Sequence, residues 1–363
     1  MKNIKKNPKQ EKYWKDRFQL SQSMGDKTET EILKTMQTVY KESLSNIQKE
    51  INAFYGKYAE QNTLTISDVK KRLDPMELKS AKEEISRYYH QIDKLARRGG
   101  KVQTSLLRQY SQTLKEQSAK AYMSRLEELK LAIQQEAIKL GVKEVETFNL
   151  SFSKLYDDTY SRVSYEIDKY MGFSNGFSER NVEKAINERW LGANYSDGIW
   201  KNKDKLINGI ETTFLQGIAR GQNPRKIASE LNKTMQTRFY NCKTLCRTET
   251  IHILNEATMD SYKDHGIERY QFVCGPDERT CSYCGSRDGE VFTIKEKMEG
   301  FNYPVLHPNC RCTTIPYFEP DEIDDMFDES TRIAKDEDGE YYDVPSSMTY
   351  DEWREMLMPV KKN

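Results

Sequence analysis

Five residues between positions 281 and 312 have types and spacings that suit a bound metal ion. Cys281 and Cys284 form a C-x-x-C pair, and His307, Cys310 and Cys312 form an H-x-x-C-x-C group. Two residues between paired cysteines let one turn direct both sulfurs at a single ion, and thiolate with imidazole suits tetrahedral zinc. We predict one structural zinc bound by Cys281, Cys284, His307 and Cys310. Cys312, two residues after Cys310, is the alternative fourth ligand.

Disulfide bonds and ordinary buried thiols are the other roles open to these cysteines. Disulfides need an oxidising compartment, and the lysine-rich N-terminus has no apolar segment of the kind that follows the lysines of a secretory signal. Scattered buried thiols have no reason to occur as paired turns beside a histidine. Zinc is therefore the favoured interpretation.

The sequence around the motif does not resemble a catalytic zinc site. A zinc deaminase needs His-x-Glu ahead of Pro-Cys-x-x-Cys, but Thr280 precedes Cys281, and no histidine of this chain has a glutamate two positions later. A hydrolytic zinc would also need an open coordination position and a nearby base. We therefore expect a structural site and no enzymatic activity.

Arg247, Thr248 and Glu249 are the remaining candidates for chemistry. On a helix, Glu249 and His252 are three residues apart and share a face, so they could form an acid/base pair. The favoured interpretation is that Arg247 or Glu249 hydrogen-bonds the zinc loop and orients its ligands. Cys242 and Cys246 are four apart on the same predicted helix, where we expect them to be small packing residues.

Helical periodicity dominates the first two thirds of the chain. Apolar residues recur at three- and four-residue steps over 28–58 and over 101–140, where Gly141 is predicted to end the helix. Further helices are predicted over 75–98, 144–170, 178–190, 194–221, 224–235 and 239–264. With 31% charged and 36% hydrophobic residues, this pattern predicts a mainly α, elongated protein rather than one deep globule.

The period changes near the C-terminus. Residues 268–274 and 289–294 read as strands, so the fold class is mainly α with a small α+β C-terminal domain stapled by zinc. We divide the chain into a basic N-terminal arm (1–27), a long-helix region (28–193), a domain over 194–318 and an acidic C-terminal tail (319–363). The zinc knuckle occupies about 267–318 of the third part.

The net charge is zero, yet the two ends of the chain differ. Residues 1–20 hold seven basic and two acidic side chains, whereas residues 319–343 hold twelve acidic and two basic ones. Charged ends on a neutral body are either solvated or contact partners. Trp14 and Phe18 lie in the basic arm, and we slightly favour a contact with another protein over packing on the same chain. No run approaches the eighteen or so apolar residues of a membrane span, so we expect no membrane contact.

Several motifs between residues 200 and 317 occur in one order and spacing. They are Trp200, Lys205-Leu206, Gly217-Ile218-Ala219-Arg220-Gly221, Asn223-Pro224-Arg225-Lys226-Ile227-Ala228, Arg247-Thr248-Glu249, Asn255-Glu256-Ala257, the 277–284 turn, Asp288-Gly289 and His307-Pro308-Asn309-Cys310-Arg311-Cys312-Thr313. This region resembles the phage head-morphogenesis family, the minor head or minor capsid proteins related to protein F of phage Mu. The order across more than one hundred residues is far more specific than any single motif.

The resemblance implies a minor head protein of a tailed phage or prophage. Such a protein would be associated with the portal and other head or scaffold proteins and would act in head assembly, with packaged DNA or its ejection as a further role. It would be located in the virion, at the head interior or portal vertex, and in the host cytoplasm during assembly. The alternative is a zinc-dependent nucleic-acid-binding protein, or a nuclease or toxin-like protein; its basic arm could neutralise phosphates.

Overall fold

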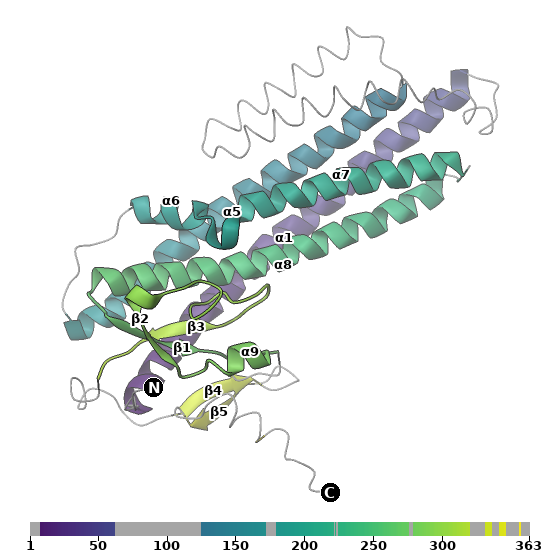
Figure 1. Ribbon diagram of the computed structural model, residues 1–363. Coiled ribbons are helices and arrows are strands. Elements are labelled where there is room, and N and C mark those ends of the chain that lie inside the picture. Colours follow the sequence, from purple (N-terminus) through teal and green to yellow (C-terminus); the bar gives the residue numbers. More distant parts are fainter. Residues whose placement is uncertain are drawn as a thin grey trace, which may run out of the picture. The chain divides into compact units, whose positions relative to one another are not determined.

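The computed structural model describes residues 8–61, 125–171, 179–220, 222, 224–275, 279–319, 331–335, 341–345 and 356 (Figure 1). The chain divides into two units. Unit 1 comprises Met1–Ile32, Asn149–Asn194 and Thr244–Asn363, and unit 2 comprises Leu33–Phe148 and Tyr195–Lys243. Helices α1, α5 and α8 contribute residues to both units, so the units differ from the consecutive division that we expected from the sequence.

Most described residues are helical, which confirms the predicted fold class. The helices are α1 (Pro8–Gln61), α5 (Arg125–Met171), α6 (Glu179–Asn187), α7 (Tyr195–Ala219) and α8 (Pro224–Asp264), and a 3-10 turn, η1 (Trp190–Gly192), precedes α7. Two predicted breaks are absent, because 144–170 continues the preceding helix and 224–235 joins 239–264. The helix predicted over 75–98, and the part of 101–140 before residue 125, lie outside the described residues. None of the described helices has a stretch long and apolar enough to span a membrane.

Glycine has a packing role in unit 2 that the sequence did not reveal. Gly141, predicted to end a helix, lies within α5, and a Cβ at this position would be 2.9 Å from Trp200 Cζ3. A Cβ at Gly217 of α7 would be 2.6 Å from Ile227 Cγ1 of α8. Both glycines therefore permit a close approach of two helices, and this packing offsets the intrinsic cost of a helical glycine.

The interior of unit 2 contains a buried charged group among apolar residues. Lys203 of α7 donates to Glu144 Oε1 of α5 at 2.7 Å and to Tyr40 Oη of α1 at 2.8 Å. Both charged side chains are almost fully buried. Asn202 extends the group by donating to Arg238 O of α8 at 2.9 Å. The apolar side chains of this interior include Met36, Ile47, Ile133, Leu206, Ile210, Phe214, Ile227 and Leu231.

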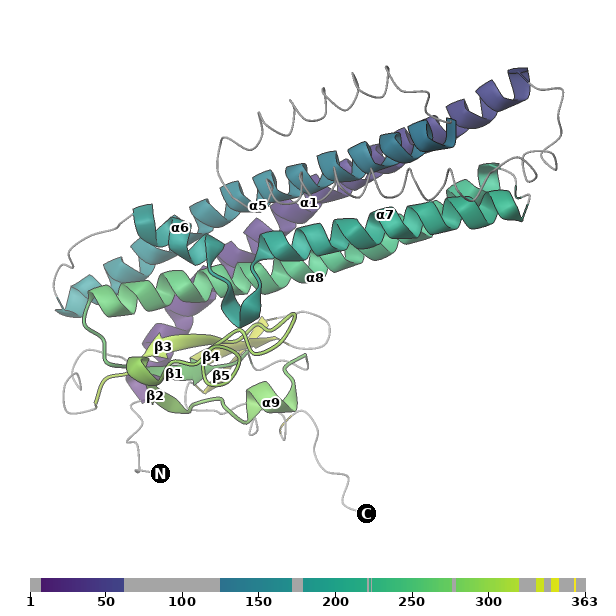
Figure 2. The ribbon, with the colours of Figure 1, turned by 45° about the horizontal axis from the view of Figure 1, so that its top comes forward.

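Unit 1 contains a three-stranded antiparallel sheet in the order β2-β1-β3 (Figure 2). The strands are β1 (Arg269–Val273), β2 (Val291–Thr293) and β3 (Thr313–Pro316), and Tyr270 lies opposite Phe292 on one side and Pro316 on the other. The strands predicted over 268–274 and 289–294 are therefore confirmed. A second, two-stranded sheet pairs β4 (Thr331–Lys335) with β5 (Tyr341–Pro345) inside the region that we expected to be an acidic tail.

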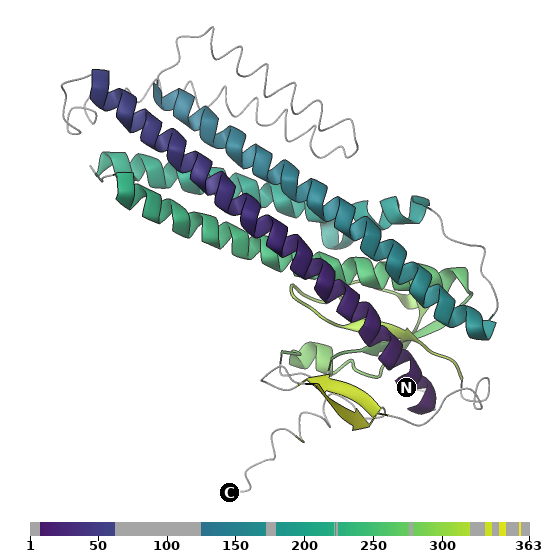
Figure 3. The same cartoon turned by 180° about the vertical axis from the view of Figure 1, so that it is seen from behind.

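The N-terminal residues of α1 belong to the core of unit 1 (Figure 3). Trp14 and Phe18 are buried among residues of α5, α8 and the sheet, including Val163, Leu254, Tyr262, Tyr270 and Ile315. Gln271 of β1 donates to Glu11 Oε1 at 2.7 Å. Residues 8–27 are therefore a packed helix and not a free arm, and the expected contact of Trp14 and Phe18 with another protein is wrong. The physical reason is the hydrophobic effect: burying the apolar area of these two side chains in their own unit lowers the free energy, whereas leaving it exposed among lysines does not.

Candidate metal centre

The first pair of ligand candidates lies on a tight turn that follows β1. Cys281 is the N-cap of α9 (Ser282–Gly285), and its Sγ accepts from the Cys284 amide at 3.4 Å. The Gly285 amide donates to Cys281 O at 2.9 Å, which closes the turn. The two-residue spacing thus brings both sulfurs to the same side of one short turn, as the sequence predicts.

The second group lies on another turn, directly before β3. The Cys310 amide donates to His307 O at 3.0 Å, and Asn309 has φ 62°, a left-handed conformation that asparagine tolerates. His307 Nδ1 lies 2.9 Å from Pro308 O, so this nitrogen is the donor and Nε2 is left as the ligand atom.

The two turns bring all five candidate ligands together. His307 Nε2 lies 3.2 Å from both Cys281 Sγ and Cys284 Sγ, and Cys284 Sγ lies 3.9 Å from Cys310 Sγ. In a tetrahedral zinc site, bond lengths of about 2.3 Å to sulfur and about 2.0 Å to nitrogen place ligand atoms about 3.6–3.8 Å apart. The ligand atoms within the set Cys281, Cys284 and His307, and within the set Cys284, Cys310 and Cys312, all lie within 4.8 Å of one another. The cluster could therefore hold a metal ion.

Neighbouring groups favour the thiolate of Cys281 and of Cys310, whereas the hydrogen bond with Cys310 raises the pKa of Cys284. Burial alone would raise the pKa of Cys281, but its hydrogen bonds with Cys284 and His307 lower it below the usual thiol range. Hydrogen bonds from Cys284 and Cys312 lower the pKa of Cys310. Burial alone would lower the pKa of His307, but the Pro308 carbonyl and the Cys310 and Cys281 thiols raise it. Thiolates that attract a positive imidazolium in this way would bind a metal cation instead.

Helix α8 holds the second turn through Thr248 and Asn255, two residues of the motifs described above whose contacts with this turn were not predicted. Thr248 Oγ1 accepts from the Asn309 amide at 3.0 Å, and Asn255 Nδ2 donates to Cys312 O at 3.2 Å. Thr248 and Asn255 lie seven residues apart and are buried, so they occupy one face of α8. The signal in the sequence that could have indicated these contacts is a pair of polar residues seven positions apart on the apolar face of a predicted helix.

Arg247 and Glu249 do not contact the metal loop, so that prediction is corrected. Arg247 makes two hydrogen bonds to the carboxylate of Glu29, at 2.6 and 3.1 Å. Glu249 accepts from Trp190 Nε1 at 3.1 Å. Neighbouring residues on a helix point in different directions, and only Thr248 of this triplet faces the loop.

Glu249 and His252 contact the same tryptophan rather than each other. The imidazole stacks on the Trp190 ring at a centroid distance of 4.5 Å, while the Trp190 N–H points to Glu249. Burial raises the pKa of Glu249 to about 8, against the opposing effect of the Trp190 hydrogen bond. Burial and the positive charge of Lys297 lower the pKa of His252 to about 3. Near neutral pH both groups are therefore largely uncharged, as expected of polar groups inside an apolar core.

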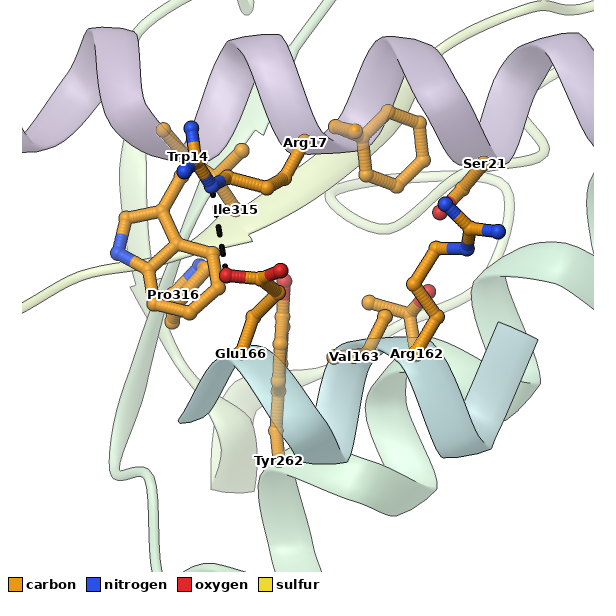
Figure 4. Close-up of a pocket in the computed structure, with 11 residues that line it drawn as sticks. Trp14, Arg17, Ser21, Arg162, Val163, Glu166, Tyr262, Ile315 and Pro316 are labelled. Atoms are coloured by element: carbon orange, nitrogen blue, oxygen red, sulfur yellow. Dashed lines mark hydrogen bonds and ion pairs between the residues drawn. The ribbon is translucent and has the colours of Figure 1, made fainter. Parts of the chain in front are cut away.

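A small cavity lies elsewhere in unit 1, beneath the first turns of α1 (Figure 4). Trp14 and Arg17 of α1 and Glu166 of α5 line it, and the Arg17–Glu166 ion pair crosses one side at 3.3 Å. Its volume is about 20 Å³, which suits a single water molecule. This volume is far below the several hundred Å³ of a typical small-molecule site, so we assign the cavity no ligand.

Comparisons of the amino-acid sequence with known proteins give one family match and two relatives. Residues 208–315 match the family model described as Phage Mu protein F like protein. Minor head protein GP7 of Bacillus phage SPP1 is 24% identical over 202 residues, which is 50% of this chain and 65% of that protein. NAD(+)--arginine ADP-ribosyltransferase EFV of Enterococcus faecalis is 22% identical over 186 residues, which is 47% of this chain and 36% of that protein.

The chain thus spans less than two thirds of the length of either relative. No solved structure matches. The matched family region begins within α7 and ends in β3, so it contains all of α8 and all five candidate ligands. Residues 208–315 of this chain are thus similar to the Phage Mu protein F like family.

Proposed function

We propose that this chain is a minor head protein of a tailed phage or prophage. It acts in head assembly by binding other head and scaffold proteins, with the portal protein as its principal partner. The match of residues 208–315 to the Mu protein F family, together with the relative named Minor head protein GP7, carries the proposal. The virion, at the head interior or the portal vertex, is the expected location, after synthesis in the host cytoplasm. Packaged DNA is a further candidate partner.

The proposed role of the Cys/His cluster is to hold one structural zinc ion. Four ligands, Cys281, Cys284, His307 and Cys310, would fill a tetrahedral coordination sphere and leave no position for substrate or water. The ion would tie the α9 turn to the segment before β3, which lies 23 residues later. We accordingly propose that the protein has no catalytic activity.

An aromatic patch beside the cluster supports a binding role. Tyr283 and Phe301 are 44% and 49% exposed, and the Arg287 guanidinium lies 4.4 Å from the Phe301 ring centroid and 5.5 Å from that of Tyr283. Tyr, Phe, Arg and Met are enriched in the central residues of protein interfaces, and the adjoining Met298 is 59% exposed. Because Tyr283 lies between two metal ligands, an ion at the cluster would also fix this surface.

The decisive experiment removes the gene from its phage and examines the particles. Loss of infectious, DNA-filled heads, and detection of the protein in wild-type heads, is the expected result. Normal particles without the protein would contradict the proposal.

A second experiment tests the contact surface by co-purification with the portal protein. The double substitution Tyr283→Ala with Phe301→Ala should weaken the association. Leu150→Ala is the control, because Leu150 is 76% exposed on α5 of the same unit. Equal retention of both variants would remove the patch from the proposal.

The second relative supplies an enzymatic alternative. Its name describes an NAD-dependent arginine ADP-ribosyltransferase, and 186 of its residues align with this chain. Incubation of the purified protein with labelled NAD and an arginine-rich acceptor tests this activity, and incubation with DNA and divalent metal tests the nuclease alternative. If either assay gave product, and Glu249→Gln or His252→Phe abolished it, the protein would be an enzyme of the corresponding class.

A further inference from the structure

Two buried residues of α8 contact the main chain on both sides of the cysteines in the second turn. Thr248 is 7% exposed, and its hydroxyl accepts from the Asn309 amide while donating to Thr244 O at 2.7 Å. Asn309 is the residue with left-handed φ, so the bond fixes its unusual conformation. The position of the chain immediately before Cys310 is thereby set by α8.

Asn255 fixes the chain two and three residues after the same cysteine. Its Nδ2 donates to Ile251 O at 2.8 Å and to Cys312 O at 3.2 Å, while its Oδ1 accepts from the Thr313 hydroxyl at 3.0 Å. The carboxamide uses both of its donors and is fully buried, so it cannot turn without leaving a polar group without a partner. Asn255 thus hydrogen-bonds two consecutive residues of the loop, Cys312 and Thr313.

Helix α1 supplies a third contact to this short segment. Gln22 Nε2 donates to Arg311 O at 3.1 Å. Main-chain groups of residues 309, 311 and 312 are therefore each held by a side chain from a helix of the same unit.

The cluster contains one thiol more than a tetrahedral ion needs beside the histidine. Cys310 and Cys312 both lie within 4.8 Å of Cys284 Sγ, so the distance to Cys284 does not choose between them as the fourth ligand. Cys310 belongs to the turn that carries His307, through the Cys310 N–H to His307 O bond, whereas the Cys312 carbonyl is bonded to α8. A loop free to slide by two residues could exchange them.

We propose that Thr248 and Asn255 are positioning residues that present Cys310 as the fourth metal ligand and hold Cys312 outside the coordination sphere. This inference rests on the proposed metal site. Groups that orient metal ligands typically change metal affinity about 10–100-fold when they are removed. Neither residue touches the ion, and their effect is exerted through the main chain of residues 309–313.

The chain offers a matched pair of threonines for the test. Thr248 and Thr258 are both buried on α8 and both donate to the carbonyl four residues earlier, but only Thr248 also bonds the metal loop. Zinc affinity of the full-length protein is measured by competition with a chelator. Thr248→Val should weaken zinc binding about 10-fold or more, Thr258→Val should leave it unchanged, and Thr248→Ser should restore it. Equal affinities in the two valine variants would overturn the inference.

The choice between the two thiols is tested with cobalt(II), whose charge-transfer band reports the number of thiolate ligands. Cys310→Ala should lose one thiolate, whereas Cys312→Ala should keep the wild-type spectrum. In an Asn255→Asp background, which lacks the donor to Cys312 O, Cys310→Ala should regain part of the band because Cys312 can enter. Loss of the thiolate in Cys312→Ala alone would refute the assignment.

The metal and the positioning roles can fail separately. A wild-type protein that binds no zinc would defeat the metal site, and the positioning role is then judged by alkylation of Cys312, which is 3% exposed. Faster alkylation of Cys312 in Thr248→Val than in Thr258→Val would sustain the role of α8. Equal alkylation rates would reject it.

Discussion

Among the described residues, each unit contains a cluster of buried polar side chains that can be compared, and the two clusters differ in how their members satisfy one another. In unit 2, Lys203 and Glu144 neutralise each other at 2.7 Å, and Tyr40 accepts from the same ammonium group. In unit 1, His307 Nε2 lies 3.2 Å from the thiols of Cys281 and Cys284, and Cys284 Sγ lies 3.9 Å from Cys310 Sγ, although a set of thiols cannot neutralise itself. The first cluster contains its own counter-charge, and the second directs several ligand atoms at one point.

This contrast separates a structural polar group from a binding site. A buried ion pair of one donor and one acceptor is complete without a ligand, and it fixes how α1, α5 and α7 meet. A set of converging soft donors gains free energy only when a cation is shared among them. Although both clusters are buried, substitutions in the two clusters should therefore change stability and metal binding in different ways.

Loss of the metal ligands should have the largest effect. The double substitution Cys281→Ser with Cys284→Ser removes two of four proposed ligands, and structural zinc contributes about 10–16 kcal/mol of apparent free energy in small zinc peptides. We expect the bound zinc to fall from about one ion per chain to none, and unit 1 to lose its cooperative thermal transition. Metal analysis and calorimetry measure these two outcomes.

Cys242→Ala is the control for this prediction, because Cys242 is equally buried but belongs to unit 2 and to neither thiol cluster. This variant should retain its zinc. A double serine variant that is metal-free yet as stable as the wild type would show that the cysteines are packing residues.

Breaking the buried ion pair should have the next largest effect. Lys203→Met leaves the Glu144 carboxylate buried without its counter-charge, which typically costs about 3–5 kcal/mol of unfolding free energy. The double substitution Lys203→Met with Glu144→Leu should recover most of this loss, because no charge remains to be buried. Urea denaturation of the three proteins measures the difference. A double variant no more stable than Lys203→Met would mean that the pair contributes more than mutual neutralisation.

Periodicity and motif spacing predicted the elements, but contacts decided where they end. Gly141 is a helix stop by local propensity, and only the neighbouring Trp200 explains why α5 continues through it. Trp14 and Phe18 read equally well as exposed anchors or core residues, since their burial depends on strands more than 240 residues later. Such long-range packing is invisible to a local pattern.

The candidate metal ligands could be predicted from the sequence, but the side-chain contacts that hold their loop in place could not. C-x-x-C and H-x-x-C-x-C spacing identifies the residues that a turn brings together. Thr248 and Asn255 act on main-chain groups about sixty residues away, so no local spacing relates them to the cysteines. Thr248 is predicted as a candidate for chemistry together with Arg247 and Glu249, but only the structure shows which of the three bonds the loop.

A third prediction concerns pH and the two groups that contact Trp190. Glu249 has a folded pKa of about 8, above the ordinary carboxyl value of 4.5, so the folded protein keeps a proton that the unfolded chain releases. Its contribution to stability is present below about pH 4.5 and is lost as pH rises toward 8. Each pKa unit corresponds to about 1.4 kcal/mol, so the difference between 4.5 and about 8 corresponds to a loss of at most about 5 kcal/mol across this window. Glu249→Gln keeps an acceptor for Trp190 and should flatten this part of the profile.

His252 should shape the acidic side of the same profile. Its folded pKa of about 3 lies below the ordinary value of 6.5, so stability falls as pH decreases from 6.5 toward 3. His252→Phe retains an aromatic ring on Trp190 and should remove this acid sensitivity without changing the alkaline limb. Chemical denaturation from pH 4 to 8.5 separates the limbs. If both variants kept the wild-type profile, other groups would cause the pH dependence. Glu256 would then be the first to examine, because burial raises its pKa to about 7 against the opposing effect of Lys297.

The smallest expected effect comes from an ion pair that, unlike Lys203–Glu144, remains in contact with solvent. Arg247 binds Glu29 with two hydrogen bonds, but the arginine side chain is 31% exposed and the glutamate 12%, against 0% and 1% for the buried pair. Water already solvates both charges in part, so a double-mutant cycle with Arg247→Met and Glu29→Gln should give a coupling free energy of about 0.5–1 kcal/mol. Arg247→Lys should lose part of it, because an ammonium cannot reproduce the two-pronged contact. Salt provides the sharper comparison: coupling at Arg247–Glu29 should decrease between low salt and 1 M salt, since the screening length falls to about 3 Å, whereas coupling at Lys203–Glu144 should persist. Equal salt sensitivity at the two sites would contradict the distinction, because it would mean that ions reach the Lys203–Glu144 pair.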